Sequence, residues 1–241
     1  MRNMLNVASI VDTSMSDWPG KTVAVVALEG CPMRCPFCFN PDMLVPHDGH
    51  EMSVDQILNQ IAYMAPILDG VVLTGGEPLM SPTSTLIELM NGIRNMGLKV
   101  AVETCGYYPE ALQALIESGC IDHVFMDLKG RSSDEAYLEA CGVPALTQVM
   151  RSLSILFTGD VPFDLRTTIF PDFPTFSDME SMGNLIKMFR NIFENNQFKM
   201  WTLQRGLPPE GVTFKYPIEA EFITDAAYRL RYILEMDEIS Y

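Results

Sequence analysis

One stretch of the sequence decides the fold, Thr22-Val-Ala-Val-Val-Ala-Leu28 followed by Glu29-Gly30 and then Cys31-Pro-Met-Arg-Cys35-Pro-Phe-Cys38. Its first part is a short apolar run rich in β-branched residues, which is typical of a strand buried in a parallel sheet. Such a strand delivers the loop that follows it to one edge of the sheet. The sequence therefore predicts a loop with three cysteines at the end of a buried strand.

Strands and helices alternate after this stretch. Apolar runs predict strands over 22–28, 70–74, 98–103, 123–127, 163–169 and 199–203, and helical periodicity predicts helices over 53–63, 85–96, 109–118, 134–140, 146–157 and 177–193. A further helix is predicted near 225–235 and an edge strand near 236–241. Alternation of this kind implies parallel strands with helices outside them. The predicted fold class is α/β, a partial (β/α)6 barrel whose active-site residues gather at the carboxyl ends of the strands.

Length and composition favour one domain over 1–241, with a barrel core at about 22–204 and a C-terminal helix and tail at about 205–241. Hydrophobic residues make up 48% of the chain, which is enough to bury a core and argues against disorder. The net charge of −15 at pH 7 argues against a nucleic-acid partner, because an acidic surface repels phosphates. Apolar runs fall far short of the roughly 20 residues of a membrane-spanning helix, and the N-terminus lacks a secretory pattern. We therefore expect a cytoplasmic protein with no membrane partner.

The cysteine spacing indicates a metal centre. Cys31, Cys35 and Cys38 form a C-x3-C-x2-C run, and three thiolates from one loop can hold three irons of a four-iron cluster. The fourth iron would keep an open coordination position for a small chelating ligand. A zinc site made of these cysteines and His47 is the alternative, but zinc motifs usually pair C-x2-C elements. His47 and His50 are expected to be solvated loop residues.

Three further cysteines stand singly in the sequence, namely Cys105, Cys120 and Cys141. None of them has a C-x2-C partner. Isolated cysteines of this kind are by default small buried hydrophobic residues. We therefore do not expect a second cluster.

Three motifs together give the chain a resemblance to a known family. They are Asp17-Trp-Pro-Gly20, the cluster loop over 30–42, and Thr74-Gly-Gly-Glu-Pro78 after the second predicted strand. In these segments the chain resembles the radical S-adenosylmethionine (radical SAM) enzymes. Within them it is similar to the activating enzymes of glycyl radical enzymes, such as those of anaerobic ribonucleoside-triphosphate reductase and pyruvate formate-lyase. The resemblance covers about residues 12 to 206 and implies a barrel of the radical SAM type.

This resemblance implies two cofactors, a 4Fe-4S cluster held by the three loop cysteines and S-adenosyl-L-methionine. Gly75, Gly76 and Glu77 would contact the amino end of S-adenosylmethionine while its amino and carboxylate groups chelate the open iron. One electron from the reduced cluster would then break the carbon-sulfur bond, giving methionine and a 5′-deoxyadenosyl radical. The two glycines suit such a site, because backbone without side chains can approach a ligand closely.

Further cofactor-binding positions also follow from the resemblance. Asp127 and Lys129 end the fourth predicted strand, where the lysine can pair with a carboxylate as a compact point charge. An exposed ion pair of little functional weight is the alternative. Glu103 ends the third strand where the family more often has aspartate, so its contact with a cation or ligand stays open. Arg166 and Gln204 match family positions near the cofactor.

The function implied is that of an oxidoreductase, an activase that abstracts a hydrogen from a glycine of a partner glycyl radical enzyme. The implied partner is anaerobic ribonucleoside-triphosphate reductase, and a flavodoxin- or ferredoxin-type protein would supply the electron. A radical SAM enzyme acting on a small molecule, similar to a carboxydeazaguanine synthase, is one alternative. A non-catalytic iron-sulfur protein is another, although the segments 74–78 and 127–129 would have no role in it.

Overall fold

A computed structural model gives the fold, and it describes residues 3–129, 133–171, 173–193, 197–207 and 219–241. The chain divides into two compact units. The first comprises Met1–Pro32, Asn40–Thr104 and Glu110–Val124, and the second comprises Met33–Phe39, Cys105–Pro109 and Phe125–Tyr241. The expectation of one domain, with a core over 22–204 and a tail over 205–241, stays a prediction. Residues 208–218 of that tail lie outside the described residues.

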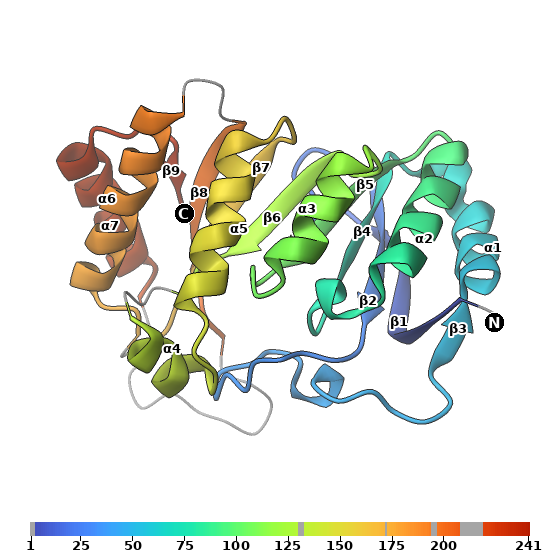
Figure 1. Cartoon of the computed structure of the whole chain (residues 1–241). Helices are drawn as coiled ribbons and strands as arrows, with labels where there is room; N and C mark the ends of the chain where they lie inside the picture. The colour runs from blue at the N-terminus through green and yellow to red at the C-terminus, as the bar shows by residue number, and fades with distance from the viewer. Residues whose placement is uncertain (1–2, 130–132, 172, 194–196, 208–218) are drawn as a thin grey trace. The chain divides into compact units, whose positions relative to one another are not determined.

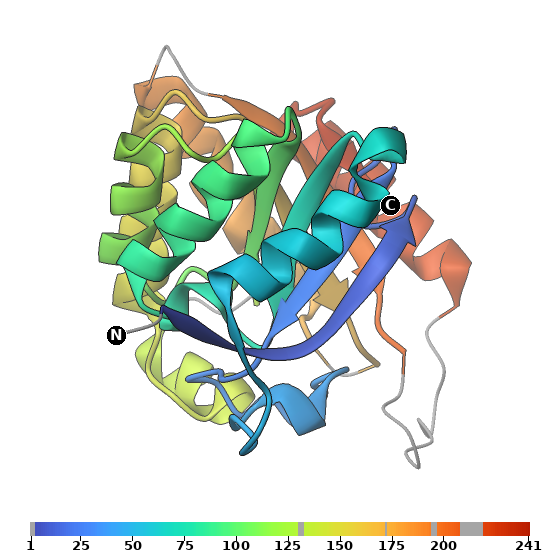
Figure 2. The ribbon, with the colours of Figure 1, turned by 90° about the vertical axis from the view of Figure 1, so that its right-hand side faces the viewer.

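The first unit contains strands in the order β3-β1-β2-β4-β5. They are β1 (Met4–Ser14), β2 (Val23–Leu28), β3 (Glu51–Ser53), β4 (Gly70–Gly75) and β5 (Lys99–Thr104). β2, β4 and β5 run parallel, whereas β1 is antiparallel to both β2 and β3 and forms the long blue ribbon of Figure 2. The carboxyl ends of β2, β4 and β5 therefore meet at one edge of this sheet.

Apolar sequence explains the centre of the first unit. All residues of β2 and the first four of β4 are buried, as expected for parallel strands covered on both faces. Helix α1 (Val54–Met64) starts with a capping box formed by Ser53 and Gln56. It packs beside α2 (Thr83–Asn95) on one face of the sheet, as Figure 1 shows. The remaining helical elements near this sheet are α3 (Pro109–Glu117) and the short 3-10 helices η1 (Pro41–Met43), η2 (Ala65–Ile67) and η3 (Pro78–Met80).

The second unit has strands in the order β6-β7-β8-β9. They are β6 (His123–Asp127), of which only the last three residues belong to this unit, β7 (Phe163–Ile169), β8 (Phe198–Arg205) and β9 (Ile239–Ser240). β7, β8 and β9 are parallel. The helices are α4 (Asp134–Cys141), α5 (Leu146–Thr158), α6 (Phe176–Ile192) and α7 (Ala220–Leu234), and α6 packs against α7.

β7 and β8 have one buried face and one half-buried polar face. On the buried face, Trp201 Nε1 donates a hydrogen bond of 3.0 Å to Thr167 Oγ1. Because side chains alternate along a strand, Arg166 and Thr168 share the opposite face of β7. The register pairs Thr168 with Gln204 of β8, so Arg166 and Gln204 lie on the same polar face.

The predicted alternation of strands and helices is confirmed up to β8, with every boundary within two residues of the expected one. β1 and β3 were not predicted. β1 shows no clear apolar alternation, since Leu5 and Val7 are its only buried residues. α7 begins at Ala220, earlier than the expected start near 225, and β9 confirms the edge strand predicted over 236–241.

Among the described residues, no single helix combines the length and apolar character needed to cross a membrane. The bent pair of α4 and α5 passes that test only when the two helices are taken together. They meet at an angle of 102°.

Candidate functional site

The cluster loop begins in the first unit, where backbone hydrogen bonds fix its start. After β2, the Gly30 N–H donates to Met43 O at 2.8 Å and the Cys31 N–H donates to Leu44 O at 3.2 Å. Cys31 is buried at the carboxyl end of β2. The first cysteine therefore lies where the sequence placed it, at the edge of the sheet where parallel strands end.

The middle of the loop, Met33–Phe39, belongs to the second unit. The backbone N–H of Arg34 donates to Cys141 O at 2.7 Å. The centroid of the Phe37 ring lies 4.4 Å from that of the Phe170 ring and 5.5 Å from that of the Phe173 ring. A turn closes between Cys38 and Cys35 through a backbone hydrogen bond of 3.0 Å. Phe37 therefore anchors the loop, and Cys35 and Cys38 on either side of it are half-buried.

The surroundings of Cys35 favour its thiolate, the form that binds iron. A hydrogen bond from the Cys141 thiol and the positive charge of Lys129 lower the pKa of Cys35 and outweigh the opposing effect of burial. The same hydrogen bond, together with burial, raises the pKa of Cys141, so the proton stays on Cys141. Cys105, Cys120 and Cys141 are buried, as expected, but the sequence did not predict the hydrogen bond from Cys141 to Cys35.

The glycines of the segment 74–78 are explained by close packing against the end of β2. Gly75 has φ +116°, and a Cβ placed on it would lie 2.2 Å from Leu28 O. A Cβ on Gly76 would lie 2.4 Å from Gly30 O. The Gly76 N–H donates to Leu28 O at 2.8 Å and the Glu77 N–H donates to Gly30 O at 2.7 Å. These glycines therefore hold the loop after β4 against the start of the cluster loop, whatever ligand they contact.

Glu77 is completely buried. Its Oε1 accepts hydrogen bonds from the Leu79 N–H at 3.0 Å and from the Thr104 hydroxyl at 2.8 Å. The carboxylate thus caps η3 and ties it to the end of β5. A contact between Glu77 and the amino end of S-adenosylmethionine stays a prediction.

Glu103 lies at the same sheet edge. Its Oε2 accepts a short hydrogen bond of 2.6 Å from the Thr74 hydroxyl, and the side chain is half-buried. The two residues belong to the neighbouring strands β4 and β5. The structure therefore pairs Glu103 with the first residue of the glycine segment, and a cation or ligand contact stays a prediction.

Asp127 and Lys129 form an ion pair in the second unit. Lys129 Nζ lies 2.8 Å from Asp127 Oδ2, and the side chains are 19% and 41% exposed respectively. Burial by itself would lower the pKa of Lys129, but the charges of Asp127 and Cys35 outweigh burial and raise it. The lysine is therefore a fixed positive charge close to one of the cluster cysteines.

Arg166 and Gln204 lie on the polar face of β7 and β8. The Arg166 guanidinium stacks over the Phe125 ring, 3.9 Å from the ring centroid. The backbone carbonyl of Arg166 accepts a hydrogen bond of 2.8 Å from the Leu128 N–H. These contacts fix Arg166 beside the end of β6, where Asp127 stands.

The predicted residues fall into two sets. The first unit brings together Cys31, the glycine segment 74–78 and Glu103, and the second unit contains Cys35, Cys38, Asp127, Lys129, Arg166 and Gln204. The sequence did not single out Thr104 or Phe37, and it predicted Cys141 only as an isolated buried residue. Thr104 could have been predicted, because it follows Glu103 at the end of a predicted strand. The roles of Phe37 and Cys141 depend on contacts between segments that are distant in the sequence.

The chain matches the Radical SAM superfamily over residues 25–185. This match spans more than half of the chain, which therefore belongs to the radical SAM superfamily. Members of this superfamily use a 4Fe-4S cluster and S-adenosylmethionine, and these are the cofactors of the chain. The donor set fits the cluster, because the expected loop supplies three thiols and the pKa of Cys35 is lowered.

Several curated proteins are similar to the chain. A protein of Methanocaldococcus jannaschii, provisionally named a glycyl-radical enzyme activating enzyme, is 30% identical over 184 residues, which is 75% of each chain. The pyruvate formate-lyase-activating enzyme of Clostridium pasteurianum is 27% identical over 200 residues, 78% of this chain and 79% of that one. A 7-carboxy-7-deazaguanine synthase of Hyperthermus butylicus is 34% identical over 113 residues, but this covers only 45% of this chain and 46% of that one.

Solved structures agree in fold. The FeFe-hydrogenase maturase HydG from Carboxydothermus hydrogenoformans superposes with a TM-score of 0.61 at 16% identity, covering 87% of this chain and 50% of that one. The radical SAM enzyme coproporphyrinogen III oxidase (HemN) from Escherichia coli gives 0.55 at 13% identity, covering 92% and 54%. The chain thus spans about half the length of these enzymes. Their likeness confirms the predicted fold class, an α/β partial barrel of the radical SAM type.

Proposed function

We propose that the chain is the activase of a glycyl radical enzyme, and that its partner is an anaerobic ribonucleoside-triphosphate reductase. The observation that carries the proposal is the C-x3-C-x2-C loop at the carboxyl end of β2, in a chain similar over three quarters of its length to proteins named as such activating enzymes. The chemistry is the abstraction of one hydrogen atom from a glycine Cα of the partner.

Cys31, Cys35 and Cys38 would hold the cluster. When bound, the cluster supplies one electron that cleaves S-adenosylmethionine to methionine and a deoxyadenosyl radical. The lowered pKa of Cys35 supports thiolate ligation at that position. The contacts of the Phe37 ring with the rings of Phe170 and Phe173 support a loop that is ordered before iron binds.

The residues that would bind S-adenosylmethionine are those that the family resemblance implies. The tight turn at Gly75, Gly76 and Glu77 leaves little room for side chains near the cluster loop, which suits a close backbone approach to the ligand. In the second unit, Lys129 offers a fixed positive charge for a carboxylate, and Arg166 and Gln204 offer donors on a polar face. Glu103 would hold its neighbour Thr74 or a cation.

The partner and the electron donor are proposed on chemical grounds. A flavodoxin- or ferredoxin-type protein would reduce the cluster. The net charge of −15 favours a partner that presents a basic face, because complementary charge speeds association. Association rates measured at rising ionic strength would then fall, and rates insensitive to salt would exclude charge steering.

The proposal is tested by anaerobic electron paramagnetic resonance of the reduced, cluster-loaded chain with S-adenosylmethionine and the large chain of the host's anaerobic ribonucleotide reductase. A glycyl radical doublet on the reductase is the expected result. Deoxyadenosine formed without any doublet would contradict the choice of partner. If neither deoxyadenosine nor a doublet forms, the radical chemistry itself is contradicted.

A second candidate function is a radical SAM reaction on a small molecule. The similarity to 7-carboxy-7-deazaguanine synthases supports it. The match to the Hyperthermus butylicus enzyme spans less than half of either chain, whereas that of Synechocystis sp. is 24% identical over 76% of this chain and 81% of that one. This enzyme would form deoxyadenosine only when its heterocyclic substrate is added. Deoxyadenosine formation that depends on the heterocycle, with no doublet on any glycyl radical enzyme, would place this candidate first.

A further inference from the structure

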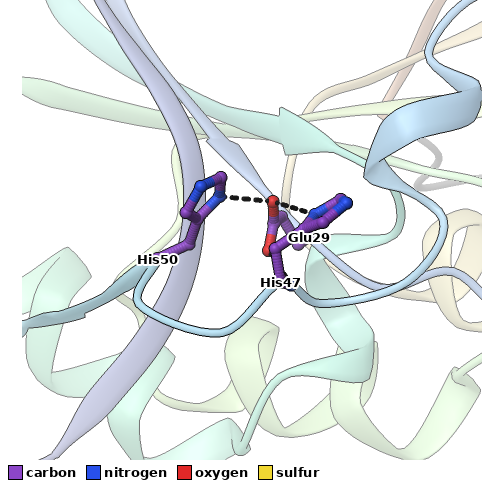
Figure 3. Close-up of side chains that lie close together, drawn as sticks. All are labelled: Glu29, His47 and His50. Carbon is purple, nitrogen blue, oxygen red and sulfur yellow. Dashed lines mark hydrogen bonds and ion pairs between the residues drawn. The ribbon is translucent and has the colours of Figure 1, made fainter.

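Among the described residues, one cluster of metal-ligating side chains lies outside the residues proposed to bind the iron-sulfur cluster and S-adenosylmethionine. Glu29, at the end of β2, faces His47 and His50 from the segment before β3, as Figure 3 shows. The Nδ1 atoms of His47 and His50 lie 2.9 and 2.8 Å from the same atom, Glu29 Oε1. The three ligand atoms lie within 4.8 Å of one another. Both histidines are exposed loop residues, as expected, but their rings also contact a common carboxylate, which the sequence did not predict.

Burial and access differ within this cluster in a way that suits an ion. The Glu29 side chain is only 2% exposed, whereas the His47 and His50 side chains are 53% and 47% exposed. A buried carboxylate is costly unless its charge is balanced. The two rings, by contrast, are in contact with solvent.

Backbone hydrogen bonds fix the geometry of the cluster. The His47 N–H donates to Glu29 Oε2 at 2.8 Å, and the His50 N–H donates to His47 O at 3.3 Å, which closes a turn between the two histidines. His50 O accepts from the Val7 N–H of β1 at 2.9 Å. The backbone of both histidines is thus held in place by β1 and by Glu29, independently of any ligand.

We propose that Glu29, His47 and His50 bind a single zinc ion. Two imidazole nitrogens and one carboxylate oxygen are a ligand set that zinc accepts, with a fourth position left for water. Zinc bonds of about 2.0 to 2.2 Å in a tetrahedral arrangement separate neighbouring ligand atoms by about 3.3 Å. The observed separations of 2.8 and 2.9 Å would have to open by only about 0.5 Å, a movement that half-exposed rings on a loop can make.

The ion would have a structural effect on the cluster loop. Glu29 stands two positions before Cys31, and the His47 turn follows the segment whose carbonyls accept from Gly30 and Cys31. Zinc would therefore clamp both ends of the loop to the end of β2. This role is separate from the proposed radical chemistry, because it requires neither S-adenosylmethionine nor a partner protein.

The test uses Co²⁺ as a spectroscopic probe for zinc in the untagged, cluster-loaded chain with its cluster oxidised. The oxidised cluster is diamagnetic, so a high-spin Co²⁺ resonance reports the new site alone, and loaded cysteines do not compete for the probe. The wild type should bind one Co²⁺ per chain, zinc should displace it, and zinc should raise the melting temperature.

The matched variants separate metal binding from the hydrogen bonds seen in Figure 3. In His47→Gln/His50→Gln the amides can still donate to Glu29 but are poor transition-metal ligands. We expect this variant to fold and to lose Co²⁺ affinity by at least about 100-fold, beyond the 10- to 100-fold typical of groups that only orient a ligand. His123→Gln, a change at the chain's third histidine, should bind Co²⁺ like the wild type.

Three results would overturn the proposal. One is a wild type that takes up no Co²⁺ or zinc at micromolar metal. Another is Co²⁺ binding that survives in the double glutamine variant. The third is a Co²⁺ spectrum with intense thiolate charge-transfer bands, which would place the ion on cysteines. None of these results bears on the glycyl radical doublet, so the two proposals fail separately.

Discussion

Replacing Gly75 by alanine should destabilise the chain far more than the same change at Gly97. Both glycines have positive φ, +116° at Gly75 and +81° at Gly97, so both variants strain the backbone. Their surroundings differ, because a Cβ on Gly97 meets nothing within 4 Å. A Cβ on Gly75 would lie 2.2 Å from the oxygen and 2.5 Å from the nitrogen of Leu28.

The expected magnitude follows from these contacts. Left-handed backbone costs an alanine about 1 to 2 kcal/mol, which is all that Gly97→Ala should lose. Overpacking adds about 1 to 3 kcal/mol. Gly75→Ala should reach the upper end of that range, because Leu28 is paired with Gly75 in the β2–β4 ladder and cannot move away without breaking hydrogen bonds. The difference between the two variants should therefore be about 3 kcal/mol.

Urea unfolding of the cluster-loaded chains under anaerobic conditions, followed by far-ultraviolet circular dichroism, measures this difference. With a slope of about 3 kcal/mol per molar urea, the midpoint of Gly75→Ala should lie about 1 M below that of Gly97→Ala. Equal midpoints for the two variants would refute the reasoning. They would mean that the glycine segment is not held against β2, and that only ligand binding requires glycine at these positions.

Three further outcomes are expected. Alanine at any one of the three cluster cysteines should abolish both the iron-sulfur absorbance and deoxyadenosine formation, whereas Cys120→Ala should keep both; cleavage retained in a ligand variant would defeat the assignment. Lys129→Met should raise the KM for S-adenosylmethionine at least tenfold with iron content unchanged. An unaltered KM would mean that the ion pair between Lys129 and Asp127 has no role in binding S-adenosylmethionine. Thr104→Val should lower the free energy of unfolding by about 1 to 3 kcal/mol, because it removes a hydrogen-bond donor to the buried Glu77 carboxylate. Thermal unfolding at the wild-type temperature would contradict a stabilising role of this hydrogen bond.

The parallel strands were predictable because their physics is local. All of β2 and the first four residues of β4 are buried apolar runs, and Ser53 before an amphipathic segment indicated the start of α1. β1 could not be recognised in the same way. Most of its residues are exposed or half-buried, and its pairing with β2 contains two register shifts, so the alternation that identifies a strand is lost.

The candidate site shows the same division. Spacing identified the cluster cysteines, since three thiols in one short loop are adjacent in any fold. Spacing could not show that Cys141 donates a hydrogen bond to Cys35. Nor could it show that Glu29 contacts His47 and His50, which lie 18 and 21 positions further along the chain. Such contacts depend on how the loop 30–50 returns to the sheet, which no periodicity in the sequence records.

The two-residue strand β9 has a consequence for handling the protein. It pairs with Trp201 and Thr202 of β8, and Arg190 holds the preceding Glu238 through two hydrogen bonds of 2.9 and 2.7 Å. β9 therefore shields part of the β8 edge, and an uncovered edge is a template for strand addition between molecules. A purification tag joined directly to Tyr241 would follow this protective strand at once, so we expect such a tag to promote association between molecules.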